Sequence, residues 1–186
     1  MLRQRVLTAL VIAPIAIAGI FLLPAQLFAL FIGAVLAVAA WEWANLANLD
    51  GGIQVAYASA VVVTFSLAHQ ASHWLTLVPA LGWWVIAAAA VVSYPAMRRW
   101  WRPVAVRVGL GFVLLVPGYV AMVVLKDQSE STYLILLLFF LIWAADIGAY
   151  FAGRAFGKRK LAPKVSPGKS WAGFAGGMVA SVGVGA

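Results

Sequence analysis

Long runs of apolar residues, separated by short polar clusters, make up most of the chain. A membrane-spanning helix needs about 20 mostly apolar residues to cross roughly 30 Å of hydrocarbon, so each long run is a candidate span. The pattern predicts seven spans, over residues 6–23, 27–48, 53–69, 80–97, 108–125, 133–152 and 171 to the end. Pro117 and Gly118 predict a kink near the middle of the fifth span. The expected fold class is all-α, in a polytopic integral membrane protein.

The composition supports a membrane protein and excludes several other classes. Of the 186 residues, 65% are hydrophobic and 10% are charged, against roughly half and a quarter in soluble domains. A soluble enzyme of this size could not bury so much apolar surface. No cysteine is present, which excludes a disulfide framework, an iron–sulfur cluster and a thiolate zinc site. We expect a single transmembrane domain over residues 1–186, with a cationic cytoplasmic loop over residues 153–170.

The distribution of basic residues predicts the orientation of the chain. With a cytoplasmic N-terminus, 12 of the 13 Lys and Arg residues lie on the cytoplasmic side, and only Lys126 lies outside. Their excess over acidic residues is then a topology signal, so we expect no nucleic-acid partner. Trp100 and Trp101 lie near an inner span end, as in an aromatic belt. The cytoplasmic basic residues are Arg3, Arg5, Arg98, Arg99, Arg102, Arg107, Arg154, Lys158, Arg159, Lys160, Lys164 and Lys169.

Two carboxylates lie inside predicted spans, where an ionised group is costly unless it faces a polar cavity or a partner. Glu42 in the second span and Asp146 in the sixth both lie about 9 Å below the inner boundary. Their matching depth suggests one shared cavity. The alternative is that each is hydrogen-bonded to a neighbouring helix, or that Glu42 reaches interfacial water.

Asp146 is the stronger candidate because of the residues that follow it. On a helix, Tyr150, Gly153 and Arg154 share its face, at i+4, i+7 and i+8. The same stretch has small-xxx-small spacing for close helix contact, through Gly148 with Ala152 or Ala149 with Gly153.

The segment after this helix suits a phosphorylated substrate. It holds six basic residues between Arg154 and Lys169, and no acidic residue occurs from Ile147 to Ala186. Ser166-Pro-Gly-Lys-Ser170 leads into an apolar helix, with Pro167-Gly168 as an expected turn and Ser170 as an expected N-cap. A helix start beside Lys169 can direct N–H groups, a dipole and an ammonium at phosphate. With one carboxylate to hold a metal, these parts favour phosphoryl or nucleotidyl transfer. The alternative is a positive-inside signal that only touches anionic headgroups.

Two other patterns do not carry a function. Gly168-Lys169-Ser170 resembles the end of a Walker A motif, but Pro163 occupies the position of its first glycine and we expect no strand before it. His69 and His73 have the spacing of a metal pair, but they lie in a predicted outer loop without a third ligand.

The stretch from Asp146 to Gly177 strongly resembles the phosphatidate cytidylyltransferases, or CDP-diacylglycerol synthases, of the bacterial inner-membrane type. It contains Asp-x-Gly-Ala-Tyr, Gly-Arg-x-Phe-Gly-Lys, Lys-Leu-Ala-Pro-Lys-Val-Ser-Pro-Gly-Lys-Ser-Trp and Gly-Phe-x-Gly-Gly. Met-Leu-Arg-Gln-Arg at the N-terminus and the segment Ala40–Leu46 are similar too. The resemblance implies a multi-pass inner-membrane enzyme that forms CDP-diacylglycerol and pyrophosphate from CTP and phosphatidate with Mg²⁺, on the cytoplasmic face.

The resemblance also implies roles for particular residues. Asp146 is the expected catalytic residue and Mg²⁺ ligand. The expected substrate-binding residues are Arg154, Lys158, Lys160, Lys164, Ser166, Lys169 and Ser170. Membrane lipid is an expected partner, and the sequence leaves open whether the protein forms a homodimer.

The sequence departs from the family in one respect. The family's C-terminal signature, Ser-x-x-Lys-Arg with Lys-Asp, His-Gly-Gly and Asp-Arg-x-Asp, is absent from these residues. We therefore expect the N-terminal portion of a longer enzyme, inactive alone. Two alternatives stay open: another CTP-using lipid enzyme, of the polyprenol kinase or CDP-archaeol synthase type, or a transporter or scaffold with Asp146 in an ion path. A transporter should show broken helices in two related halves, whereas only the fifth span looks interrupted.

Overall fold

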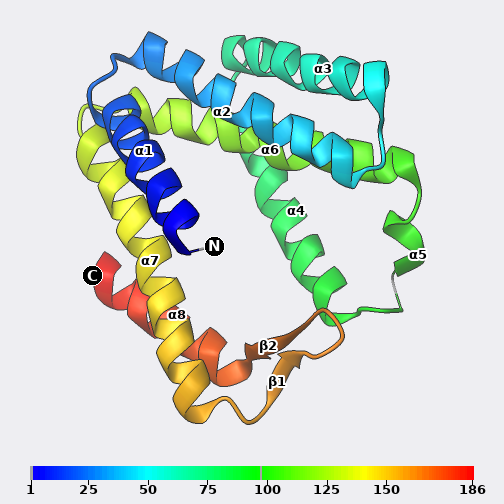
Figure 1. Cartoon of the computed structure of the whole chain (residues 1–186), viewed down its shortest axis with the longest axis vertical. Helices are drawn as coiled ribbons and strands as arrows, with labels where there is room; N and C mark the ends of the chain where they lie inside the picture. Colours follow the sequence, from blue (N-terminus) through cyan, green and yellow to red (C-terminus); the bar gives the residue numbers. More distant parts are fainter. Residues whose placement is uncertain (1, 97) are drawn as a thin grey trace. The chain divides into compact units, whose positions relative to one another are not determined.

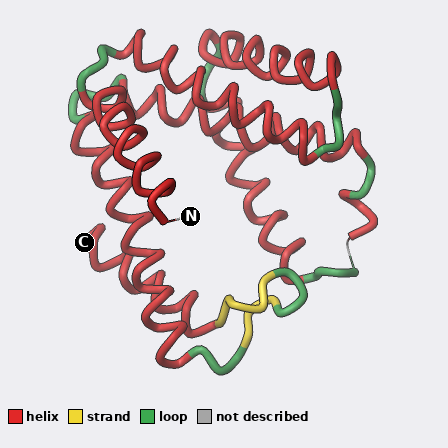
Figure 2. Tube along the Cα trace, in the orientation of Figure 1, coloured by secondary structure: helices red, strands yellow, loops and turns green. Residues whose placement is uncertain are grey.

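The structure is a computed structural model that describes residues 2–96 and 98–186, with side chains described from Leu10 onward. Helices dominate it (Figures 1 and 2). The predicted N-terminal cations Arg3 and Arg5 therefore lie outside the described side chains. The elements are α1 (Leu2–Phe21), α2 (Ala25–Leu46), α3 (Gly51–Gln70), α4 (Trp74–Val92), α5 (Arg98–Trp101), α6 (Val104–Lys126), α7 (Ser131–Phe156), β1 (Lys160–Ala162), β2 (Ser166–Ser170) and α8 (Trp171–Gly185).

The described residues contain five helices that are long and apolar enough to cross a membrane, namely α2, α3, α4, α6 and α7. The apolar part of α1, Leu10–Phe21, and α8 are shorter. Large apolar side chains point outward from these helices, as Leu81 at 69% and Val85 at 72% exposure do on α4. Because contact of these apolar faces with water would be unfavourable, they require lipid around them. The chain is thus a multi-pass, mostly helical membrane protein.

Several predicted boundaries were wrong by a few residues. α4 begins at Trp74 instead of residue 80, because the backbone N–H groups of Leu75 and Leu77 already donate to Ser72 and His73. α7 ends at Phe156 instead of residue 152, with Gly157 as its C-cap. The cationic loop is correspondingly shorter than 153–170. α6 continues through Pro117 as one helix.

Contacts within the chain divide it into two compact units. The first, Met1–Leu77 with Leu110–Ser129, contains α1, α2, α3 and most of α6. Aromatic contacts join α3 to α6 in this unit: Phe65 and Tyr119 stack with ring centroids 4.7 Å apart, and Tyr57 meets Phe112 edge-on at 5.3 Å. A side chain at Gly111 would collide with the Tyr57 hydroxyl, so glycine makes room for the Tyr57 side chain against α6.

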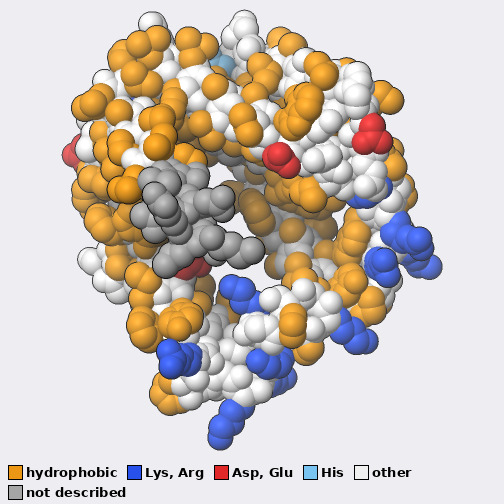
Figure 3. All heavy atoms as spheres, in the orientation of Figure 1, with side chains coloured by type: hydrophobic (Ala, Val, Ile, Leu, Met, Phe, Trp, Pro, Cys, Tyr) orange, Lys and Arg blue, Asp and Glu red, His pale blue; other side chains and the backbone are white. Residues whose placement is uncertain are grey.

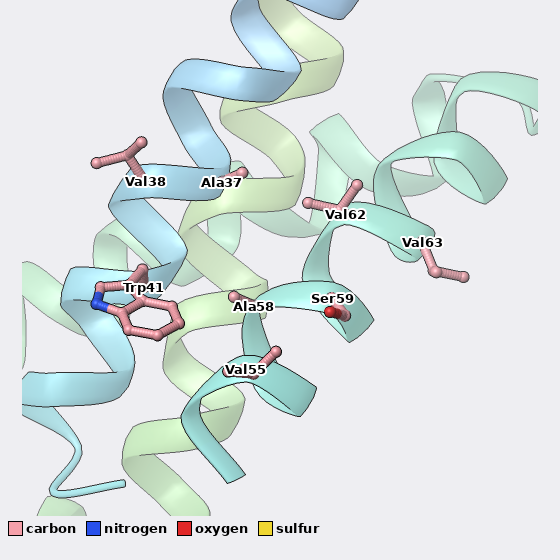
Figure 4. Close-up of a pocket in the computed structure, with 8 residues that line it drawn as sticks. All are labelled: Ala37, Val38, Trp41, Val55, Ala58, Ser59, Val62 and Val63. Atoms are coloured by element: carbon pink, nitrogen blue, oxygen red, sulfur yellow. The ribbon is translucent and has the colours of Figure 1, made fainter. Parts of the chain in front are cut away.

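An apolar groove of about 660 Å³ lies between α2 and α3 in this unit (Figure 4). Apart from the Trp41 indole, the Ser59 hydroxyl is the polar side-chain group in its lining. The groove therefore has no charged group with which to hold a phosphate or a metal. Its lining residues are Ala37, Val38, Trp41, Val55, Ala58, Ser59, Val62 and Val63.

Lys126 links the C-terminal end of α6 to the C-terminal end of α1. Its Nζ donates to the Ile20 carbonyl at 2.7 Å and lies 5.2 Å from the centroid of the buried Phe28 ring. The Ile20 carbonyl belongs to the last turn of α1, where helical partners are missing, so the ammonium both caps the turn and favours its dipole.

We expect Lys126→Met to lower the free energy of unfolding by about 1–3 kcal/mol, because the charged hydrogen bond is lost while the chain length is kept. The measurement is thermal unfolding of the purified chain in detergent. Gln128→Met is the matched control, since Gln128 follows α6 and its side chain donates to the Val124 carbonyl of that same helix. Equal destabilisation by both changes would contradict the capping role.

The second unit, Val78–Gly109 with Glu130–Ala186, contains most of α4, then α5, α7, α8 and the two strands. α7 and α8 pack antiparallel through small residues: a Cβ on Gly148 would lie 2.5 Å from the Gly176 carbonyl oxygen, and one on Gly177 would lie 2.9 Å from that of Ala145. Ser181 Oγ donates to the Leu141 carbonyl across the same contact at 3.2 Å. The predicted small-residue spacing of α7 is confirmed, and α8 is the partner it serves.

The segment between α7 and α8 is a β-hairpin, which the all-α prediction did not include. β1 and β2 pair antiparallel with Lys160 opposite Ser170 and Ala162 opposite Ser166. The turn falls at residues 163–165, so the predicted turn at Pro167-Gly168 was wrong and both residues lie in β2. The expectation of no strand before Gly168 was wrong as well. A Walker A motif still fails, because Gly168-Lys169-Ser170 lies within a strand and Pro163 replaces the first glycine.

Candidate active site

A cavity of about 690 Å³ lies where α7, the hairpin and α8 meet, within the second unit. α7 supplies its acid and one of its cations, and β2 supplies the second cation and a hydroxyl. We call it the Asp146 pocket. Its lining residues are Asp146, Ala149, Tyr150, Gly153, Arg154, Leu161, Gly168, Lys169, Ser170, Gly173 and Phe174.

The α7 side of the pocket has the predicted spacing. Asp146, Tyr150, Gly153 and Arg154 all line it, so the shared helix face is confirmed. Arg154 Nη1 donates to Tyr150 Oη at 3.4 Å, so the guanidinium lies beside a residue one helical turn from Asp146. Asp146 itself is exposed. A carboxylate and a guanidinium thus lie on one wall, both accessible to a ligand.

Ser170 connects the hairpin to α8. It is 5% exposed, and its Oγ accepts from the Gly173 N–H at 3.1 Å, so the predicted N-cap is confirmed. Gly153 and Gly157 make room for it: a Cβ on either would lie 3.4 Å or 2.8 Å from Oγ. Because a hydroxyl keeps one proton to donate after accepting, Ser170 can still donate to a ligand oxygen.

The start of α8 offers fewer free donors than the sequence suggests. The N–H of Trp171 donates to the Arg159 carbonyl at 3.0 Å, and that of Gly173 is used by Ser170. The helix dipole still favours an anion here. Direct hydrogen bonds to phosphate would therefore come mainly from the side chains of the pocket.

The structure brings together only part of the predicted set. Asp146, Arg154, Lys169 and Ser170 line the pocket. The three other lysines are exposed and Ser166 is half-buried, and none of these four lines it: Lys158, Lys160, Lys164 and Ser166. Their role in binding stays a prediction.

The pocket is also lined by three residues that were not predicted as site residues, namely Leu161, Gly168 and Phe174. Leu161 lies in β1 and Gly168 in β2, and the sequence did not predict these strands. Arg159 was left out of the predicted set, and its guanidinium carbon lies 6.0 Å from the Trp171 ring centroid, where it stacks on the first residue of α8.

The pocket offers a metal ion one carboxylate. Within the described part of the chain, no three His, Cys, Asp or Glu side chains gather as a metal site, and this includes the region of His69 and His73. Mg²⁺ is commonly bound by one or two carboxylates together with substrate phosphates and water. Asp146 fits that arrangement only with a phosphate-bearing substrate present. Glu42 is exposed on α2, so the cavity shared with Asp146 stays a prediction.

Comparison with known proteins places the chain in a family. The model of the cytidylyltransferase family matches residues 3–186. The phosphatidate cytidylyltransferase of Pseudomonas aeruginosa is 48% identical over 183 residues, covering 96% of this chain and 67% of that protein. That of Haemophilus influenzae is 36% identical over 203 residues, covering 98% and 70%. That of Aquifex aeolicus is 41% identical over 68 residues, covering 37% and 26%. No solved structure matches the chain.

The family match extends over both compact units, and residues 146–174, which hold the pocket lining, lie inside it. An apolar helix pair that presents a carboxylate, two cations and a hydroxyl beside a cationic hairpin agrees with such a match. On these grounds, the chain belongs to the cytidylyltransferase family.

Proposed function

We propose that the protein transfers the cytidylyl group of CTP to phosphatidate, giving CDP-diacylglycerol and pyrophosphate. The observation that carries this proposal is the Asp146 pocket, where Asp146, Arg154 and Lys169 line one cavity formed by α7, β2 and α8 of a multi-pass membrane protein. The names of the relatives support it. A lipid substrate and a soluble polyanion need such a cationic pocket next to the membrane.

In the proposed reaction, a phosphate oxygen of phosphatidate attacks the α-phosphorus of CTP. A new P–O–P bond forms to the lipid phosphate, and the bond between the α-phosphorus and the bridging oxygen breaks, releasing pyrophosphate. Two polyanions must approach each other, so neutralisation and positioning are the main tasks of the protein. Arg154 and Lys169 bind phosphate oxygens, and the Ser170 hydroxyl donates a further hydrogen bond. Arg154, steadied by Tyr150, presents a planar fork suited to two oxygens.

Mg²⁺ is the cofactor we propose, with Asp146 as its protein ligand within the pocket. When bound with CTP, the ion would neutralise charge on the phosphates. The role of Asp146 is then to orient the metal-bound triphosphate against Arg154 and Lys169.

We propose that the protein lies in the bacterial inner membrane with seven spans, a cytoplasmic N-terminus and a cytoplasmic active face. The five long apolar helices support a multi-pass arrangement, and the shorter α1 and α8 would supply the remaining two spans. Placing Lys and Arg by the positive-inside rule then puts the hairpin on the cytoplasmic side, where CTP is available. A homodimer remains a prediction from the sequence.

We expect Arg154→Gln to raise the KM for CTP about tenfold or more, because it removes a charge-assisted hydrogen bond to phosphate. Arg159→Gln is the matched control: the same charge is lost five positions along, from a guanidinium that stacks on Trp171 outside the pocket lining. The measurement is CDP-diacylglycerol formation from labelled CTP in mixed micelles, by the protein completed with the family's C-terminal signature.

Equal effects of the two substitutions would remove Arg154 from the site. A labelled product other than CDP-diacylglycerol, such as CDP-archaeol, or phosphorylation of a polyprenol would instead support the other lipid enzymes. No product from any of these acceptors would favour the transporter or scaffold.

A further inference from the structure

The connection between α4 and α6 carries a cluster of arginines and tryptophans that the proposed reaction does not use. Arg98, Arg99 and Arg102 are exposed, Trp100 is 61% exposed and Trp101 is half-buried. Figure 3 shows Lys and Arg side chains gathered over this region as well as over the hairpin. We call residues 98–102 the arginine segment.

The arginine segment lies at a membrane surface. α4 and α6 are both long and apolar enough to span the bilayer, so the short connection between them must lie at the boundary with water. Exposed tryptophan favours this depth, where its ring meets acyl chains and its N–H meets headgroups. Trp100 therefore fixes the segment at the level of lipid phosphates.

No carboxylate of the surrounding sequence neutralises these cations. The chain contains no Asp or Glu between Asp50 and Asp127. Arg99 lies over the Trp100 ring, with its guanidinium carbon 5.7 Å from the centroid. A guanidinium held against a ring by a cation–π contact still has N–H donors for a ligand.

The three exposed cations of the arginine segment are all arginines, unlike those of the cationic hairpin, where Lys158, Lys160 and Lys164 are interspersed. A guanidinium binds phosphate through two parallel N–H bonds, whereas an ammonium acts as a point charge. The segment thus has the chemistry of a phosphate-binding surface at headgroup depth.

We propose that the arginine segment binds the phosphomonoester headgroup of an anionic phospholipid in the adjacent leaflet. A phosphomonoester carries a charge of about −1.5 to −2 at pH 7 and three terminal oxygens. A phosphodiester headgroup offers fewer oxygens and less charge to three guanidinium groups. If the proposed function holds, the segment retains the substrate lipid near the enzyme; the binding itself does not depend on that activity.

The test measures how fast each arginine of the full chain reacts with phenylglyoxal, with the modified residues located by peptide mass spectrometry. The chain is placed in phosphatidylcholine nanodiscs alone, with added phosphatidate, or with added phosphatidylglycerol. A further sample contains phosphatidylcholine nanodiscs and soluble glycerol 3-phosphate. Arg159, exposed in the same unit, is the internal comparison.

Each basic residue near an anionic surface strengthens binding about fivefold. We therefore expect phosphatidate to slow modification of Arg98, Arg99 and Arg102 about tenfold or more, with a smaller effect of phosphatidylglycerol and none of glycerol 3-phosphate. Equal slowing of Arg159, equal slowing by phosphatidylglycerol, protection by glycerol 3-phosphate, or no slowing would each overturn the proposal. Because no turnover is measured, failure of the proposed reaction leaves this result interpretable.

Discussion

Asp146→Asn is expected to reduce CDP-diacylglycerol formation about a hundredfold or more, which is the scale of losing one preorganised electrostatic group in an active site. The amide keeps the size of the side chain but not its negative charge. It would therefore not attract a metal ion by charge, and it would not orient a triphosphate bound together with that ion. Asp146 is exposed in its pocket, so the substitution leaves no buried charge unpaired.

The matched control for this change is Glu130→Gln, at the N-terminus of the same helix. Glu130 is the N-cap of α7 and makes no side-chain capping bond, so its charge should matter little to the helix. Activity would be measured with labelled CTP on the protein completed with the family's C-terminal signature, and membrane insertion by extraction of the membrane fraction. An Asp146→Asn protein that inserts normally and keeps full activity would remove Asp146 from the site.

Gly176→Ala is expected to separate α7 from α8 and to lower the free energy of unfolding by about 1–3 kcal/mol, the usual range for an overpacked contact. The added Cβ would collide with that of Ala152 and lie 2.8 Å from the Gly148 carbonyl oxygen. Both neighbours are close to the backbone of α7 and cannot move without moving the helix. The Asp146 pocket, built on this helix pair, should lose its activity along with the stability.

Gly183→Ala provides the control within α8, because a Cβ there has nothing within 4 Å. It should stabilise the helix slightly, since alanine favours helix by about 1 kcal/mol over glycine. Thermal unfolding of both variants in detergent gives the comparison. If Gly176→Ala and Gly183→Ala change stability in the same direction, the close contact of α7 with α8 does not hold the unit together.

The membrane character of the fold could be predicted from hydropathy alone, because a long apolar helix is stable in lipid whichever helices it packs against. The face shared by Asp146, Tyr150 and Arg154 also followed, since helical periodicity depends only on spacing. Ser170 was foreseen as an N-cap for a similar reason: capping is a local hydrogen bond. Each of these features depends on residues near one another in the sequence.

The hairpin was missed because its pairing depends on where α7 ends and α8 begins. Pro167 and Gly168 favour a turn by their own conformations, yet the turn falls earlier, at residues 163–165. Because Lys160 pairs with Ser170 and Ala162 with Ser166, Pro167 and Gly168 both lie in β2. As a result, the sequence could not separate Lys169, which lines the pocket, from Lys164, which does not.

The most direct measurement is to locate the nucleotide with a photoreactive CTP analogue that carries its crosslinker on the terminal phosphate. Attached label would be mapped by peptide mass spectrometry on the purified chain in nanodiscs. We predict label on peptides that contain lining residues between Asp146 and Phe174, lost with excess CTP and in the double variant Arg154→Gln with Lys169→Gln. Label confined to α2 and α3, or label that excess CTP does not displace, would contradict the assignment of the Asp146 pocket as the site of cytidylyl transfer.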